Sequence, residues 1–112
     1  MLKSFWYALH GIREASRERN FDVQLVIGAI AIILAFVLGI PATEKMIIVL
    51  CVGLVLGSEA MNSATERLLN FVSQEYREEI HEIKDLMAAA VLIFSIVAFV
   101  IGIWIFGKAI FL

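Results

Sequence analysis

The sequence predicts an all-α membrane protein in which an amphipathic interfacial helix precedes three transmembrane helices. Of the 112 residues, 62% are apolar, and the mean hydropathy is +0.93; both values are typical of integral membrane proteins. The apolar residues are gathered into three long runs separated by polar segments. The formal net charge of −2 gives no basic surface for nucleic acid, so no nucleic-acid partner is expected.

Residues 1–19 are predicted to form an amphipathic helix at the membrane surface. Apolar residues recur there at i, i+3, i+4, i+7 and i+10, namely Leu2, Phe5, Trp6, Leu9 and Ile12. The remaining positions are too polar to cross a bilayer, which favours an interfacial location. A second stripe contains Tyr7, Gly11, Glu14 and Glu18. From the residues alone, this stripe is either a solvated face or part of a chemical site.

A single domain covers residues 1–112, with transmembrane spans predicted at 21–40, 43–71 and 86–107. The second span continues into a cytoplasmic extension. Residues 72–85 are charged and are predicted to form a cytoplasmic connection.

Two single residues complete this organisation. Asn20 is the predicted N-cap of the first span. Cys51 is the only cysteine, so no disulfide forms within the chain, and its apolar surroundings favour a buried, inert thiol.

The basic residues predict a cytoplasmic N-terminus. With that orientation, seven of them lie inside, namely Lys3, Arg13, Arg17, Arg19, Arg67, Arg77 and Lys84. Only Lys45 and Lys108 then lie outside, which agrees with the positive-inside rule. The polar clusters of interest therefore fall on the side of the membrane where ATP is present.

The segment 58–66 follows an uncharged apolar run and carries two carboxylates. Charged groups at membrane depth cost about 2.5–3.5 kcal/mol each on insertion scales, so a functional site is a natural hypothesis. On a helix, Glu59, Asn62, Ser63 and Glu66 share one face. One carboxylate would then hold a metal while the other accepts a proton. A polar stripe that joins transmembrane helices explains the same residues without chemistry, and both interpretations stay open at this point.

Two motifs resemble those of a known family. The stretch Glu59-Ala60-Met61-Asn62-Ser63-Ala64-Thr65-Glu66 resembles the signature of the small bacterial membrane diacylglycerol kinases, a family that includes undecaprenol kinases. The block Lys84-Asp85-Leu86-Met87-Ala88-Ala89-Ala90-Val91-Leu92 is similar to a second motif of that family, at the usual separation. The amino-terminal segment, with Glu18-Arg19-Asn20-Phe21, is similar as well, so the resemblance covers almost the whole chain.

The resemblance implies transfer of the γ-phosphate of Mg-ATP to the hydroxyl of a membrane lipid by a homotrimer with sites shared between subunits. It implies these roles: Glu59 as general base; Glu18 and Glu66 as magnesium ligands; Tyr7, Tyr76, Lys84 and Asp85 as ATP contacts; Asn62 and Ser63 as supporting residues. It also implies a location in the bacterial cytoplasmic membrane.

Some positions depart from the family pattern. Asn70 stands where many members have Asp, and His81 stands where a basic or small residue is usual. The amino-terminal helix is one residue shorter than usual between Gly11 and Glu18, which leaves Glu14 as an alternative metal ligand.

Diacylglycerol is the substrate expected first, with phosphatidic acid as product, and undecaprenol is the alternative. The chain has no GxxxxGK[ST] loop, so the phosphates must be bound by helices and side chains instead of a P-loop. Two rivals from other classes are a small multidrug transporter and a non-catalytic membrane subunit. The transporters usually have four spans with a glutamate in the first, whereas the first span here has no acid after Asp22. A non-catalytic subunit gives no reason for several carboxylates on one membrane face.

Overall fold

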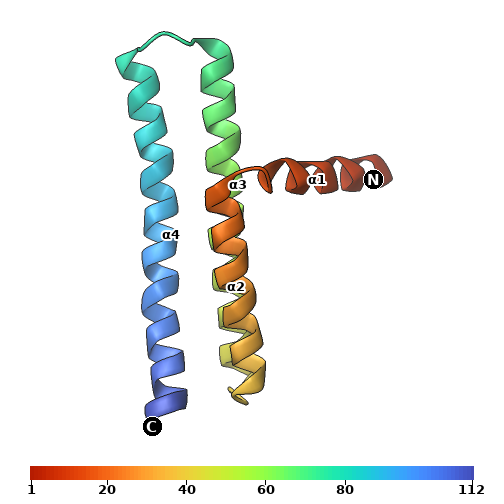
Figure 1. Cartoon of the computed structure of the whole chain (residues 1–112), viewed down its shortest axis with the longest axis vertical. Helices are drawn as coiled ribbons and strands as arrows, with labels where there is room; N and C mark the ends of the chain where they lie inside the picture. Colours follow the sequence, from red (N-terminus) through yellow and green to blue (C-terminus); the bar gives the residue numbers. More distant parts are fainter.

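The computed structural model describes all 112 residues and contains four helices: α1 (Leu2–Ala15), α2 (Arg19–Val37), α3 (Ala42–Val72) and α4 (Glu78–Phe111). The last three run alongside one another, and α1 projects sideways from the bundle at the start of α2 (Figure 1). Each of α2, α3 and α4 is long and apolar enough to cross a membrane. The all-helical fold with three candidate spans is therefore confirmed.

The predicted end of the first helix at residue 19 is wrong, because α1 ends at Ala15. The backbone N–H groups of Arg17 and Glu18 donate to the carbonyl oxygens of Glu14 and Ala15, three residues back, so the last turn tightens before the chain becomes extended. Glu18 has an extended backbone and occupies the N-cap position of α2, so the predicted N-cap at Asn20 is also wrong. This short break allows α1 to turn away from the bundle.

The predicted connection over 72–85 is helical for most of its length, because α4 already begins at Glu78. Glu78 and Glu79 lie in its first turn, where carboxylates interact favourably with the helix dipole. Lys84 and Asp85 are therefore helical residues. The opposite connection, between α2 and α3, turns at Gly39, whose φ of +65° is readily adopted by glycine.

Both α2 and α4 pack against α3. Ala35, Ile40, Ile48 and Ile105 form the buried apolar cluster near the α2–α3 turn. Only 11 of 112 residues are buried, so most apolar side chains face outward, as lipid-facing or subunit-facing surfaces do. At the same end of the bundle, Lys108 Nζ lies 2.7 Å from Glu44 Oε1 as an ion pair without hydrogen-bond alignment.

The contact between α2 and α3 fixes the position, along the bundle axis, of the motif segment, residues 59–66 of α3. The two helices are antiparallel, and Gly28 lies against Val52. Because both helices rise equally per residue, the first residue of α2, Arg19, lies at the level of about residue 61 on α3. Glu59 therefore lies close to the level at which α2 begins, and Figure 1 shows α1 turning away from the bundle at the start of α2.

Substitution of Gly28 by Ala should destabilise the bundle. A Cβ atom at Gly28 would lie 2.6 Å from Cγ1 of Val52, closer than atoms in contact allow. Overpacking of this kind costs about 1–3 kcal/mol, and a second change, Val52→Ala, should restore most of that loss. Gly53→Ala is the matched control, since a Cβ there meets nothing within 4 Å. Thermal unfolding in detergent micelles compares the stability of the wild type, Gly28→Ala, the double variant with Val52→Ala, and Gly53→Ala. Equal losses of stability in Gly28→Ala and Gly53→Ala would contradict the close approach of α2 and α3.

Candidate active site

The motif segment of α3 passes from a buried to an exposed environment. Glu59 is only 7% exposed, and it takes part in none of the ion pairs of the chain. One turn further on, Asn62 and Ser63 are half-buried, and Glu66 is exposed. This motif face, made of Glu59, Asn62, Ser63 and Glu66, thus combines a shielded carboxylate, an amide and a hydroxyl, and a carboxylate open to water. Two carboxylates in such different environments are suited to different roles.

Next to this face, Arg67 connects α3 to the α1–α2 junction. Its Nη1 donates to Glu14 Oε2 at 3.2 Å, and its Nη2 donates to Glu18 Oε1 at 3.1 Å. Nη2 also donates to the backbone carbonyl of Glu14 at 3.3 Å. The Arg67 hydrogen bond, together with the charge of Arg17, holds the pKa of the Glu14 carboxyl below its usual range. Glu14 is therefore a carboxylate at neutral pH.

A cleft of about 530 Å³ lies between α1 and α3 beside this cluster. Its wall includes Gly11 from the Tyr7 stripe, Ser63 from the motif face and Arg67. A Cβ at Gly11 would meet nothing within 4 Å, so the space on that side of the cleft is open. The polar side chains that line the cleft are Glu14, Ser63 and Arg67, whereas Glu59 and Glu66 are not part of its wall.

A second polar group lies where α3 meets α4. Lys84 Nζ donates to Asn70 Oδ1 at 2.9 Å, so a neutral amide holds the ammonium group and leaves its charge uncompensated. Tyr76 and His81 pack edge to face, with ring centroids 5.3 Å apart and an interplanar angle of 86°. The two positions that depart from the family pattern thus contact two of the predicted ATP-binding residues.

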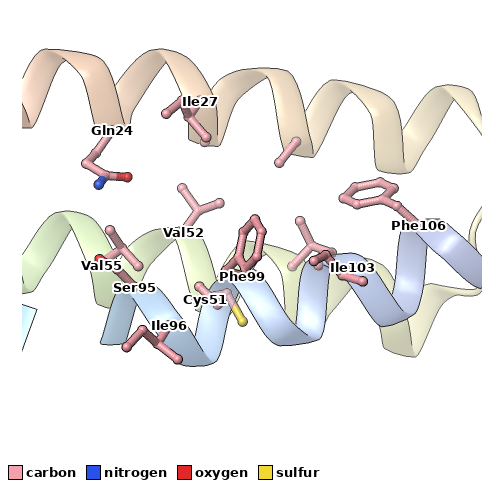
Figure 2. Close-up of a pocket in the computed structure, with 15 residues that line it drawn as sticks. Gln24, Ile27, Cys51, Val52, Val55, Ser95, Ile96, Phe99, Ile103 and Phe106 are labelled. Carbon is pink, nitrogen blue, oxygen red and sulfur yellow. The ribbon is translucent and has the colours of Figure 1, made fainter. Parts of the chain in front are cut away.

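An apolar groove of about 660 Å³ runs between α2, α3 and α4. Figure 2 shows Gln24 from α2 and Phe99 from α4 pointing into it, with Val52 of α3 between them. Asn70 and Lys84 are in contact and α3 and α4 are antiparallel, so Ser95 lies at about the level of Glu59. One end of the groove therefore reaches the height of the motif face.

The predicted metal ligands fit magnesium in chemical kind. Magnesium is usually held by one or two carboxylates together with phosphate oxygens and water. The exposed Glu66 carboxylate forms no ion pair, whereas Glu18 is paired with Arg67. No cluster of three or more potential ligands is assembled within the chain. A site built on Glu18 and Glu66 would therefore need oxygen atoms from the nucleotide and a change of partner at Glu18.

The structure brings some of the predicted site residues together and leaves others apart. Arg67, the residue after Glu66, contacts Glu18, while Lys84 and Tyr76 belong to the group at the α3–α4 connection. No ion pair or side-chain hydrogen bond joins these two groups. Tyr7 and Asp85 are exposed and make neither kind of contact. The sequence prediction missed the role of Arg67, although its position directly after the motif and opposite two acidic residues was a usable signal.

Comparisons with known proteins agree along nearly the whole chain. The family model described as prokaryotic diacylglycerol kinase matches residues 6–106. An undecaprenol kinase of Bacillus subtilis (strain 168) is 32% identical over 105 residues, which are 93% of this chain and 85% of that protein. A diacylglycerol kinase of Escherichia coli (strain K12) is 33% identical over 99 residues, or 88% and 81% of the two chains. A diacylglycerol kinase of Synechocystis is 34% identical over 104 residues, covering 91% of this chain and 59% of that protein.

Proposed function

This chain belongs to the prokaryotic diacylglycerol kinase family, and from that premise we propose that it transfers the γ-phosphate of Mg-ATP to the hydroxyl of diacylglycerol. As a family member it is a lipid kinase of the membrane. The new bond joins the lipid oxygen to the γ-phosphorus, the bond from that phosphorus to the β-phosphate breaks, and ADP leaves with phosphatidic acid as the other product.

The observation that carries this proposal is the environment of Glu59. Glu59 is 7% exposed and lies at the height where α1 leaves the bundle, level with one end of the apolar groove. A lipid whose chains occupy that groove presents its hydroxyl at this height. Glu59 accepts the hydroxyl proton as the oxygen attacks the γ-phosphorus, a role that typically contributes about 10²–10⁴-fold to the rate. Asn62 and Ser63, one turn further along the same face, support the reacting groups.

Phosphoryl transfer depends mainly on positioning and on neutralising charge around the γ-phosphate. Glu18 and Glu66 would hold magnesium, which supplies positive charge to the phosphate oxygens when bound. Lys84 adds a compact charge whose amide partner, Asn70, leaves it available to phosphate. Tyr7, Tyr76 and Asp85 complete the proposed ATP contacts.

Replacement of Asn70 by Asp should weaken ATP binding. The new carboxylate would form an ion pair with Lys84 in place of the present 2.9 Å hydrogen bond and would neutralise its charge. Exposed ion pairs are weak, so we expect the KM for ATP to rise about two- to fivefold with little change in kcat. Asn70→Ala is the control that removes the hydrogen bond and adds no charge. Steady-state kinetics with varied ATP compares Asn70→Asp with Asn70→Ala. Equal KM values for ATP in the two variants would show that the charge of Lys84 does not matter for ATP binding.

Undecaprenol is the second candidate substrate. The undecaprenol kinase of Bacillus subtilis aligns over 105 residues, slightly more of this chain than the Escherichia coli diacylglycerol kinase does. Both lipids present a primary hydroxyl on an apolar body, and a groove that mainly recognises apolar chains discriminates poorly between them. Some activity on both lipids is therefore expected.

Purified protein in mixed micelles tests the proposal directly. Radiolabel is followed from Mg-ATP into diacylglycerol or undecaprenol, and the two kcat/KM values are compared. If kcat/KM is about tenfold or more higher for undecaprenol, equal to ~1.4 kcal/mol, undecaprenol replaces diacylglycerol as the proposed substrate. No transfer to either lipid by folded protein would refute the kinase mechanism proposed for this chain. In a separate assay, dye export coupled to protons would indicate the transporter alternative.

We also propose that α1 lies in the cytoplasmic interface and that three chains assemble with shared sites. The apolar residues of α1 are all exposed, namely Leu2, Phe5, Trp6, Leu9 and Ile12. A membrane surface would cover them. Within one chain, no ion pair or side-chain hydrogen bond joins the Lys84–Asn70 pair to the Glu18–Arg67 pair. Assembly of a site between neighbouring subunits would account for their separation.

The bias in basic residues predicts a cytoplasmic N-terminus and an external C-terminus in the bacterial cytoplasmic membrane. Single cysteines at Ser16, Ala42 and Ser73, introduced after Cys51→Ala, report the side of each connection. In intact cells, an impermeant maleimide should label position 42 only. Labelling at position 73 would show that the orientation is the opposite one and that the site does not face cytoplasmic ATP.

A further inference from the structure

Arg67 is the one side chain of α3 that hydrogen-bonds to α1 and to the α1–α2 junction. Its guanidinium binds two carboxylates at once, with distances of 3.2 Å to Glu14 and 3.1 Å to Glu18. The planar fork of arginine suits such double contacts better than the point charge of lysine. Lining the α1–α3 cleft, it also faces the volume beside the motif.

We propose that Arg67 is a positioning residue that holds the Glu18 carboxylate in the metal-free enzyme and competes with magnesium for it. The inference rests on the proposed role of Glu18 as a magnesium ligand. Glu18 Oε1 is bound to Arg67, so this oxygen must leave the guanidinium before it binds a metal. A divalent cation at Glu18 would also repel the positive charge of Arg67.

Glu14 gives the arrangement its second part. Arg67 binds both the side chain and the backbone carbonyl of Glu14, and these two contacts do not involve Glu18. The guanidinium therefore stays attached to α1 when Glu18 exchanges its partner. Glu14 also draws Arg67 away from Glu18, since one cation is shared between two carboxylates. The pair Glu14–Arg67 thus sets how readily Glu18 becomes available.

Binding of Mn²⁺ tests this without measuring catalysis. Mn²⁺ prefers the same oxygen ligands as magnesium, and its free concentration is read by electron paramagnetic resonance in the presence of a non-hydrolysable ATP analogue. Arg67→Gln should tighten Mn²⁺ binding about two- to fivefold, the range expected for an exposed ion pair. A purely structural role predicts the opposite, because a loosened junction weakens binding. Arg17→Gln is the matched control: Arg17 Nη1 lies 3.7 Å from Glu14 Oε2, and the Arg17 side chain forms no ion pair with Glu18.

Glu14→Gln should have the reverse effect and weaken Mn²⁺ binding about twofold, because Arg67 then binds Glu18 alone. In the Arg67→Gln background the same substitution should change nothing, which a double-mutant cycle reveals. If Glu14 were itself a ligand, the loss would persist in that background, and the inference would be overturned. A shift in Arg67→Gln no larger than in Arg17→Gln would overturn it as well.

The wild type and Glu66→Gln separate this inference from the proposed function. Normal nucleotide-dependent Mn²⁺ binding by the wild type, weakened in Glu66→Gln but unaltered in Arg67→Gln, would refute the inference alone. Absence of such binding by folded wild-type protein would refute the magnesium site itself, and the inference with it. Thermal unfolding of each variant in the same micelles verifies that all of them are folded.

Discussion

Replacing Glu59 by Gln is expected to lower kcat by about 10²–10⁴-fold, because the amide cannot accept the proton of the lipid hydroxyl. The KM for ATP should change little, since Glu59 lies on the buried part of the motif face and is not among the proposed nucleotide contacts. Shape and volume are nearly the same in the two side chains, so the bundle should remain folded. Radiolabel transfer from ATP to lipid measures both parameters.

Two comparisons make the Glu59 result specific. Glu75→Gln removes the same charge from an exposed position on the α3–α4 connection and should leave kcat within about twofold, as surface changes usually do. Raising the magnesium concentration should not restore Glu59→Gln, because the missing function is proton transfer. Turnover close to the wild-type value would show that another group accepts the proton.

The sequence predicted the helical fold and its three spans because long apolar runs are strong signals. A run such as 86–106 has one compatible structure in a bilayer, a helix that satisfies its own backbone. Spacing alone also placed Glu59 and Glu66 on one face of a single helix, since the helical repeat fixes that relation. What spacing alone predicted about the site therefore concerned residues close together along one element.

Helix ends were predicted less well, because local bonds decide them. Backbone bonds from Arg17 and Glu18 to carbonyl oxygens three residues back close the last turn of α1, which ends four residues before the expected position. The charged residues after 77 looked like a connection, whereas Glu78 and Glu79 are favourable at the start of a helix. Polarity alone did not distinguish a solvated loop from a solvated helix.

Contacts between distant segments were beyond what spacing reveals. Arg67 meets Glu18 across 49 positions and Asn70 meets Lys84 across 14, and both pairings depend on how the helices cross. A sequence without an alignment carries no record of such pairs. The resemblance suggested roles for Glu18 and Lys84, but their partners became visible only in three dimensions.

The second large effect is expected at the proposed magnesium ligands. Glu66→Gln should raise the magnesium concentration needed for half-maximal activity about 10- to 100-fold, or ~1.4–2.7 kcal/mol of metal binding, since one of the two proposed carboxylate ligands is lost. Glu66 is exposed and unpaired, so no neighbouring group replaces it. Glu18→Gln should act in the same direction, and Glu14→Gln should change the requirement by about twofold at most, an effect passed on through Arg67.

Excess magnesium distinguishes these variants from loss of the base. At saturating metal, Glu66→Gln and Glu18→Gln should regain a substantial part of their activity, because the remaining carboxylate and the phosphates still bind the ion. Activity of each variant is therefore measured across a magnesium series at fixed ATP. If Glu14→Gln instead shows the larger shift and Glu18→Gln shows none, Glu14 is the amino-terminal ligand. The ion would then be held one turn earlier, at the end of α1, by the carboxylate whose pKa Arg67 lowers.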